Sequence, residues 1–253
     1  MVDTLADLLS QAADYDQQLP PPPPLLTPPL GKEVAMWIDH TLLKPDATSH
    51  QIKNLCHDAL KYHFAAVCVN PAYVLQAQKL LVNSGVAICT VIGFPLGATL
   101  PTVKAIEALS CLQAGATEID MVLNIGALKS GNYGLVLNEI QSVVQIVHNQ
   151  GGIVKVILET ALLSRQEKII ACLVSKVAGA DFVKTSTGFG PGGASIEDVG
   201  LMCRAIGPGM RVKASGGIRN LTDALMMIQA GATRIGTSAG VTIVEEARNK
   251  TLD

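Results

Sequence analysis

Short apolar runs alternate with longer segments along most of the chain. The runs are rich in β-branched residues, which is typical of strands. They begin near Met36, Ala66, Val86, Glu118, Ile153, Asp181, Arg211 and Arg234. The segments between them are long enough for helices, so the pattern predicts eight strand–helix units.

Start and stop signals mark several of the expected helices. The start signals are two capping boxes and two single N-caps: Thr48 with Gln51, Ser164 with Glu167, Ser195 and Asn220. Three similar sequences, at 114–120, 178–184 and 230–236, repeat one junction in which a glycine ends a helix and a strand follows. Such a repeat is expected of a regularly alternating α/β protein.

The fold class predicted from this alternation is α/β, as a single (β/α)8 TIM barrel over residues 35–253. Parallel strands covered by helices are buried on both faces and read as apolar runs. An open doubly wound sheet is the alternative, but the G-x-G-x-x-G sequence that usually follows its first strand is absent.

Residues 1–34 form a separate Pro-rich N-terminal arm in this interpretation. Seven of the thirteen prolines lie in the first 30 residues, five of them consecutively at Pro20 to Pro24. Such a run adopts extended polyproline II and cannot enter a core. Before it, the spacing of Leu5, Leu8, Leu9 and Ala12 predicts a short helix. We expect the arm to be partly disordered, with the proline run serving as a stiff spacer or as an SH3-type ligand.

The composition is apolar, with 49% hydrophobic and 16% charged residues. Mean hydropathy is +0.36, yet no unbroken apolar run reaches the ~20 residues of a membrane span, so no membrane partner is expected. The scarcity of charge fits many buried strands, or a surface hidden in an oligomer such as a homodimer.

The charge is divided unevenly between the arm and the barrel. Four aspartates give residues 1–31 a charge of −4, and the remaining 17 acidic and 19 basic residues give the rest +2. A body so close to neutral offers no basic stripe for nucleic acid.

The six cysteines show no C-x-x-C pair, which argues against a disulfide scaffold and against a structural zinc site. The acidic N-terminus lacks the basic region of a signal peptide. A cytoplasmic location is therefore expected.

Polar residues at the ends of the predicted strands are the candidates for chemistry, because barrel active sites lie at those ends. Lys184 and Lys213 close the sixth and seventh strands and should be neighbours. Lys155 and Glu159, four residues apart on one strand face, are expected to form a structural ion pair.

Two adjacent ammonium groups suggest either a phosphate binder or an activated amine. A second cation ~5 Å away at an effective dielectric constant of ~20 costs a charged lysine roughly 3 kcal/mol, or about two pKa units. Schiff-base chemistry becomes accessible to such an amine. Asp120, at the end of the fourth strand, would relay protons or simply neutralise the two lysines.

Glycines in three loops indicate close approach to an anion. They lie after the sixth strand (Gly188, Gly190, Gly192 and Gly193), the seventh (Gly216 and Gly217) and the eighth (Gly236). No H-x-H or H-E-x-x-H sequence or acidic cluster points to a metal, so metal-independent chemistry without a cofactor is expected.

These stretches, taken together, resemble the deoxyribose-phosphate aldolase family. The matching sequences are IDHTLLKPDAT (38–48), AVCVNP (66–71), VIGFPLGA (91–98), GATEIDMVLNIGALKSG (115–131), VKVILET (154–160), ADFVKTSTGFGPGGAS (180–195), VKASGGIR (212–219) and GATRIGTSAG (231–240). The resemblance implies a Schiff-base aldehyde-lyase that reversibly cleaves 2-deoxy-D-ribose 5-phosphate to acetaldehyde and D-glyceraldehyde 3-phosphate. The implied partner is this small phosphorylated sugar.

The resemblance also implies roles for individual residues. Lys184 would form the Schiff base, Lys213 would lower the pKa of Lys184, and Asp120 would donate and accept protons. Eight further residues would contact substrate: Asp39, Thr41 and Cys68 near its aldehyde and hydroxyl groups, and Gly188, Gly216, Gly217, Gly236 and Ser238 at its phosphate. Cys68 is equally well explained as a buried core residue that does not contact substrate.

Two departures from the family pattern stand out. Phe189 occupies the place of a basic phosphate contact, and the last tyrosine is Tyr133, so the C-terminal tyrosine of some members is missing. Two other functions remain open: another Schiff-base sugar-phosphate aldolase or transaldolase, and a non-catalytic phosphate-ligand sensor.

Overall fold

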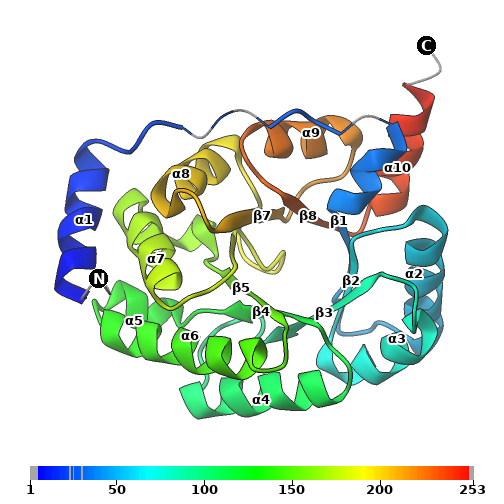
Figure 1. Ribbon diagram of the computed structural model, residues 1–253, viewed down its shortest axis with the longest axis horizontal. Coiled ribbons are helices and arrows are strands. Elements are labelled where there is room, and N and C mark those ends of the chain that lie inside the picture. Colours follow the sequence, from blue (N-terminus) through cyan, green and yellow to red (C-terminus); the bar gives the residue numbers. More distant parts are fainter. Residues whose placement is uncertain (1–4, 23, 25, 30, 251–253) are drawn as a thin grey trace.

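The computed structural model describes residues 5–22, 24, 26–29 and 31–250, and within them eight parallel strands close into a barrel ringed by helices (Figure 1). Each strand pairs with the next one in sequence, and β8 pairs with β1 to complete the ring. The strands are β1 (Ile38–Leu42), β2 (Ala66–Val69), β3 (Ala87–Ile92), β4 (Glu118–Val122), β5 (Ile153–Ile157), β6 (Phe182–Lys184), β7 (Arg211–Ser215) and β8 (Arg234–Thr237). The predicted (β/α)8 barrel is confirmed.

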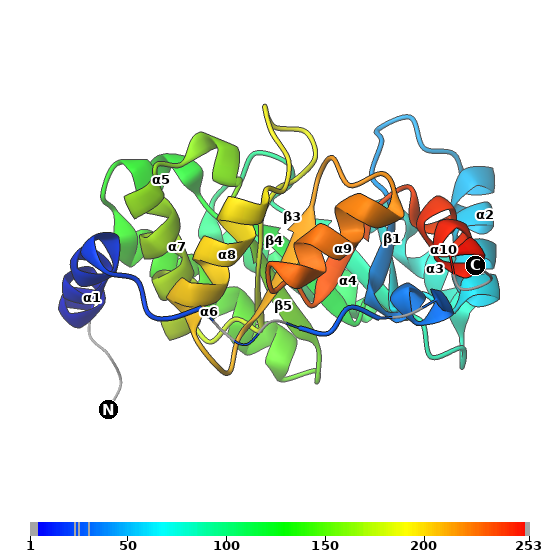
Figure 2. The same cartoon turned by 90° about the horizontal axis from the view of Figure 1, so that it is seen from above.

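Helices connect the strands and cover their outer faces (Figures 1 and 2). The α-helices are α1 (Leu5–Gln17), α2 (Ser49–Tyr62), α3 (Val74–Leu81), α4 (Pro101–Gln113), α5 (Ile125–Lys129), α6 (Tyr133–His148), α7 (Arg165–Val177), α8 (Ile196–Ile206), α9 (Leu221–Gln229) and α10 (Gly240–Asn249). In the described part of the chain, the 3₁₀ helices η1 (Gly31–Trp37), η2 (Pro71–Tyr73) and η3 (Thr160–Leu162) precede β1, α3 and α7.

The predicted helix signals are confirmed by local geometry. Both capping boxes form at the starts of α2 and α7, and the side chains of Ser195 and Asn220 cap α8 and α9. In the repeated junction, Gly115, Gly179 and Gly231 all have φ between +84° and +113°. L-residues with side chains rarely adopt this conformation, which explains why glycine stands at each of these helix ends.

The first strand begins later than the hydrophobic pattern predicts. Residues from Gly31 to Trp37 form η1, which packs against α10, and β1 starts only at Ile38. The expected boundary between arm and barrel, at 34/35, therefore falls inside a 3₁₀ helix whose Val34 and Ala35 are buried.

The arm lies along the outside of the barrel. Leu8 and Ala12 of α1 are buried, and α1 packs against α7, with Asp16 paired to Arg165 at 3.4 Å. The Arg204 guanidinium of α8 donates hydrogen bonds to the carbonyls of Leu19 (3.1 Å) and Pro20 (2.6 Å). The chain then continues past α8 toward α10 (Figure 2).

Four prolines of the arm, with α8 and the start of β7, line an apolar cavity of about 520 Å³. The arm is thus packed on the barrel along the part that the structure describes; Asp3 and Pro23 lie outside that part. Its role as spacer or ligand stays a prediction.

A buried ion pair fixes the end of β4 from outside the barrel. The Lys104 ammonium contacts Glu139 and donates to the Val122 carbonyl, each at 2.8 Å, while Glu139 also accepts the Asn124 amide at 2.6 Å. Both charged side chains are fully buried between α4 and α6. This clamp holds the carboxyl end of the strand that carries Asp120.

Candidate active site

The barrel interior is half apolar and half charged. On the side of β2 and β3 it is filled by a small apolar cluster that includes Cys68, Cys89 and Val91. The other strands point charged side chains inward. These are Asp39 of β1, Glu118 and Asp120 of β4, Lys155 of β5, Lys184 of β6, Lys213 of β7 and Arg234 of β8.

Asp120 lies at the centre of this charged half. Its Oδ1 contacts the Lys155 ammonium at 2.8 Å, and its Oδ2 contacts both Lys184 and Lys213 at 2.8 Å. Lys184 and Lys213 are also register partners on β6 and β7. The two nitrogens share one carboxylate oxygen, so they are no further apart than twice that contact distance.

The surrounding charges fix the protonation of Asp120 and Lys213. Burial raises the pKa of the Asp120 carboxyl, but Lys155, Lys184 and Lys213 outweigh burial and hold that pKa well below its usual range. Burial by itself lowers the pKa of Lys213, but Asp120 and Asp39 outweigh it, so the pKa is raised. Asp120 is therefore an anion here and Lys213 a cation.

Lys184 is the member of this group that reaches solvent. It is the last residue of β6 and is 3% exposed, while Asp120, Lys155 and Lys213 are completely buried. A cavity of about 520 Å³ opens at the carboxyl ends of the strands, and Lys184 lines its floor. A small molecule in the cavity would meet this amine.

Most of the predicted substrate contacts line the same cavity. They are Thr41, Gly188, Gly216, Gly217, Gly236 and Ser238. The loop glycines adopt conformations that suit glycine, with φ of +85° at Gly188, +88° at Gly216 and +82° at Gly217. The backbone of these glycine loops, without covering side chains, forms the polar side of the cavity.

Two predicted contacts lie deeper than expected. Asp39 is fully buried and pairs with Lys213 and Arg234, so it lies beneath the mouth instead of at it. Burial raises the pKa of Asp39, but Lys213, Arg234 and Lys155 outweigh burial and lower it to about 2. Cys68 is also fully buried and does not line the cavity. Both side chains therefore lie inside the barrel, below the cavity.

Two basic residues that sequence reasoning did not single out line the cavity. Lys44 follows β1 and Arg219 follows β7, and both are exposed. They stand within the sequences 38–48 and 212–219, each a few residues after a strand end. Position after a strand end was the signal that could have found them.

The expected ion pair between Lys155 and Glu159 is wrong. β5 ends at Ile157, and Glu159 has a left-handed backbone with φ of +55°, which turns its side chain away from the strand face. Lys155 instead contacts Glu118 at 2.6 Å and Asp120. Glu159 is buried and accepts hydrogen bonds from the amide (3.1 Å) and hydroxyl of Thr187. It therefore anchors the loop after β6.

Phe189 stands at the rim of the cavity. It is 49% exposed, and its ring meets that of Phe94 edge-on with centroids 5.3 Å apart. The two residues come from the loops after β6 and β3. The sequence lacks a basic phosphate contact at position 189, and a pair of aromatic rings lies there instead.

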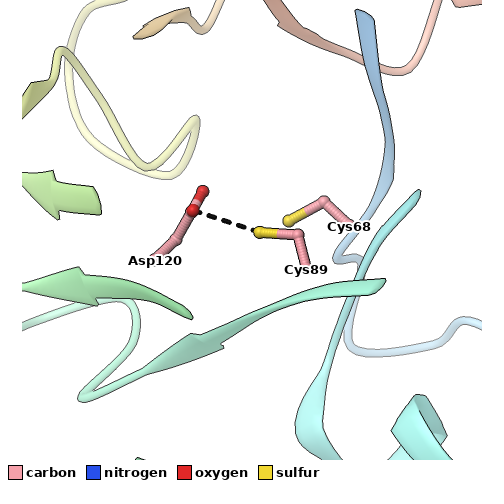
Figure 3. A group of neighbouring side chains, drawn as sticks. All are labelled: Cys68, Cys89 and Asp120. Atoms are coloured by element: carbon pink, nitrogen blue, oxygen red, sulfur yellow. Dashed lines mark hydrogen bonds between the residues drawn. The ribbon is translucent and has the colours of Figure 1, made fainter. Parts of the chain in front are cut away.

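Cys68, Cys89 and Asp120 gather inside the barrel, with both sulfurs directed toward the carboxylate (Figure 3). Their ligand atoms lie within 4.8 Å of one another, and the Cys89 thiol donates to Asp120 at 3.1 Å. Burial raises the pKa of Cys89, and three ammonium groups already surround Asp120. Those cations repel a metal ion, so the group is better suited to hydrogen bonding than to metal coordination.

Comparisons with known proteins agree with this geometry. The family model described as DeoC/LacD family aldolase matches residues 33–246. The deoxyribose-phosphate aldolase of Caldanaerobacter subterraneus subsp. tengcongensis is 58% identical over 220 residues, which cover 87% of this chain and 95% of that protein. The one from Thermococcus gammatolerans is 56% identical over 222 residues, covering 87% and 99%.

A solved structure of similar shape supports the same assignment. It is the tetrameric deoxyribose phosphate aldolase of Aeropyrum pernix, with a TM-score of 0.81 and 37% identity. The match covers 99% of this chain and all of that chain.

Proposed function

Because this chain belongs to the DeoC/LacD family of aldolases, we propose that it reversibly cleaves 2-deoxy-D-ribose 5-phosphate to acetaldehyde and D-glyceraldehyde 3-phosphate. Such a reaction serves the breakdown of deoxyribose phosphates. The observation that carries the proposal is the position of Lys184, which contacts Asp120 and also lines the mouth cavity. An amine at this position would lie within reach of a small sugar phosphate bound in the cavity.

The first step is formation of a Schiff base. The neutral amine of Lys184 attacks C1 of the open-chain aldehyde and forms a carbinolamine, which takes up a proton and loses water to give a protonated imine. The Asp120 carboxylate contacts the Lys184 nitrogen and is placed to accept protons there and pass them on through water. Lys213 keeps that carboxylate oriented by donating to the same oxygen.

The second step breaks the carbon–carbon bond. The C3 hydroxyl loses its proton to a base, the C2–C3 bond breaks, and its electron pair moves to C2 to form an enamine as the iminium is neutralised. D-Glyceraldehyde 3-phosphate departs. The enamine is protonated at C2, and water then hydrolyses the new imine to release acetaldehyde and the free amine of Lys184. No metal or cofactor takes part in this sequence.

We assign the phosphate of the substrate to the polar side of the cavity. The glycine loops after β6 and β7, together with Gly236 and Ser238 around the end of β8, would supply backbone donors. Lys44 and Arg219 add positive charge at the same mouth. These two cations take over the role that Phe189 cannot fill.

Removing either cation should weaken binding of the phosphorylated substrate. We expect Arg219→Met and Lys44→Met each to raise KM for deoxyribose 5-phosphate by about 10-fold or more, with a smaller effect on kcat, since a hydrogen bond to a charged group contributes roughly 1.5–3 kcal/mol. Unphosphorylated 2-deoxyribose should be cleaved equally by the variants and the parent enzyme. Lys53→Met, on the exposed face of α2, is the matched control. Equal losses with both sugars would contradict the assignment.

The function itself is tested by product analysis. The enzyme is incubated with deoxyribose 5-phosphate without added metal, and the amounts of acetaldehyde and glyceraldehyde 3-phosphate are measured. We expect the two products in equal amounts. In the reverse direction, acetaldehyde and dihydroxyacetone are compared as donors with the same aldehyde acceptor. Reaction with dihydroxyacetone alone would indicate a transaldolase-like activity, and no turnover with either would favour a phosphate-binding protein.

The helices, the cysteines and an exposed apolar patch bear on the cellular setting and the assembly of the protein. Among the residues that the structure describes, every helix falls short of the length and apolar character that a membrane span requires. All six cysteines are free and buried, which supports a cytoplasmic location. Assembly as a homodimer stays a prediction, supported by the exposed apolar side chains of Leu100, Val103 and Ile106 at α4.

A further inference from the structure

The charged side chains inside the barrel form a closed ring. Arg234 begins it at the amino end of β8, where its guanidinium contacts Asp39 and Glu118. One path runs from Asp39 to Lys213 and on to Oδ2 of Asp120. The other runs from Glu118 to Lys155, at 2.6 Å, and on to Oδ1 of Asp120, at 2.8 Å.

The charges of the ring balance one another, and the charge of Lys184 is additional to them. Within the described residues, the ring contains three carboxylates and three cations and is neutral as a whole. Lys184 is attached to it as a branch through Oδ2 of Asp120. A charged Lys184 leaves one uncompensated positive charge in the interior, whereas a neutral amine leaves none. The net charge of the ring therefore acts on the step in which Lys184 gains or loses its proton.

We propose that Arg234 and Glu118, at the end of the barrel opposite the mouth, are positioning residues that set the pH at which Lys184 becomes nucleophilic. The proposal rests on the proposed function, because it assigns that role to Lys184. Neither residue lines the mouth cavity, so both act through the ring. Arg234 is 13% exposed and Glu118 5%, which shields their charges from solvent screening.

The two residues should act in opposite directions. Arg234→Met removes a positive charge, leaves the ring negative and holds the proton on Lys184 to higher pH. Glu118→Gln removes a negative charge and has the reverse effect. A unit charge roughly 10 Å away at an effective dielectric constant of about 20 shifts a titration by about one pH unit.

Other titratable groups surround Lys184, and their titration must be distinguished from that of Lys184. The groups that face it inside the barrel are Asp39 on β1, Cys68 on β2, Cys89 on β3, Asp120 on β4, Lys155 on β5 and Lys213 on β7. Glu159, Lys44 and Arg219 lie toward the mouth. Of the two thiols in this set, Cys68 is the one with a lowered pKa, chiefly because of its hydrogen-bonding contact with Cys89. Repeating the variants in a Cys68→Ser background separates its titration from that of Lys184.

The pH dependence of kcat/KM for deoxyribose 5-phosphate tests the proposal. We expect the acid limb to move up by about one pH unit in Arg234→Met and down by about one unit in Glu118→Gln. The double variant restores a neutral ring and should return the limb to the parent position. Arg234→Lys keeps the charge and should leave the limb unmoved. Shifts in the same direction, or no shift in folded variants, would overturn the proposal.

A second measurement avoids dependence on turnover and on a single variant. Propanal and borohydride are added at a series of pH values, and the reduced adduct on Lys184 is quantified by mass spectrometry of the peptide. The midpoint of adduct formation should move as the acid limb does. If Arg234→Met does not fold, Glu118→Gln alone must still move the midpoint down. If the propanal adduct forms but deoxyribose 5-phosphate is not cleaved, the proposed substrate is wrong. The shift of the midpoint in the variants would still test the role of Arg234 and Glu118.

Discussion

Lys184→Met is expected to lower kcat/KM for deoxyribose 5-phosphate by at least about 10⁴-fold, because no other described amine both contacts Asp120 and lines the mouth cavity. Methionine fills the space of the buried lysine stem but cannot form an imine. The variant should be about as stable as the parent protein, because the substitution leaves the six paired charges of the ring in place. Loss of activity will thus be separable from loss of fold.

Borohydride reduction provides the direct measurement. With deoxyribose 5-phosphate and borohydride, the parent protein should gain one reduced adduct, located by peptide mass spectrometry at Lys184. Lys53→Met, which changes an exposed lysine on α2, should behave as the parent does. An adduct that persists at full yield in Lys184→Met would show that another amine forms the Schiff base.

Asp120→Asn is expected to reduce both stability and activity. The change leaves three ammonium groups around a neutral side chain, and breaking a buried ion pair in this way costs about 3–5 kcal/mol of unfolding free energy. Activity should fall by about 10²–10⁴-fold, the usual contribution of a positioned proton-transfer group. Urea unfolding and steady-state kinetics measure the two effects.

A second substitution separates these effects. Adding Lys155→Met to Asp120→Asn removes one of the stranded charges, so much of the lost stability should return. The kinetic defect should remain, because Lys155 does not line the cavity. If activity returned together with stability, Asp120 would act only as a structural counter-ion, which is the other role that its spacing allows.

Local features of the fold could be predicted from the sequence because they depend on neighbouring residues. Capping boxes need a hydroxyl and an acidic or amide side chain three residues apart, and a helix-ending glycine needs only its own freedom of φ. The pairing of Lys184 with Lys213 was also predictable, since they occupy matching positions on adjacent parallel strands, although β7 continues past Lys213 to Ser215. Asp120 lies in the middle of β4, not at its end, and meets the two lysines across the barrel interior.

The partners of Lys155 could not be predicted in the same way. The expectation of a pair with Glu159 assumed that β5 continues for two more residues, but the strand ends at Ile157 and the backbone reverses. The true partners, Glu118 and Asp120, are two residues apart on β4 and so point to one face. Which charges meet across a closed barrel depends on the stagger of its strands, which local patterns do not specify.

The closed ring also restricts how the barrel interior can change by mutation. Each of its six charged members contacts at least two others, so any single charge-altering substitution leaves a buried charge unmatched. Positions 39, 118, 155, 213 and 234 can therefore exchange charge only in compensating pairs, with an unstable intermediate between them. In directed evolution, we expect tolerated substitutions at rim residues such as Phe94 and Phe189. Single substitutions that change the charge of a ring residue should be rejected because they destabilise the protein.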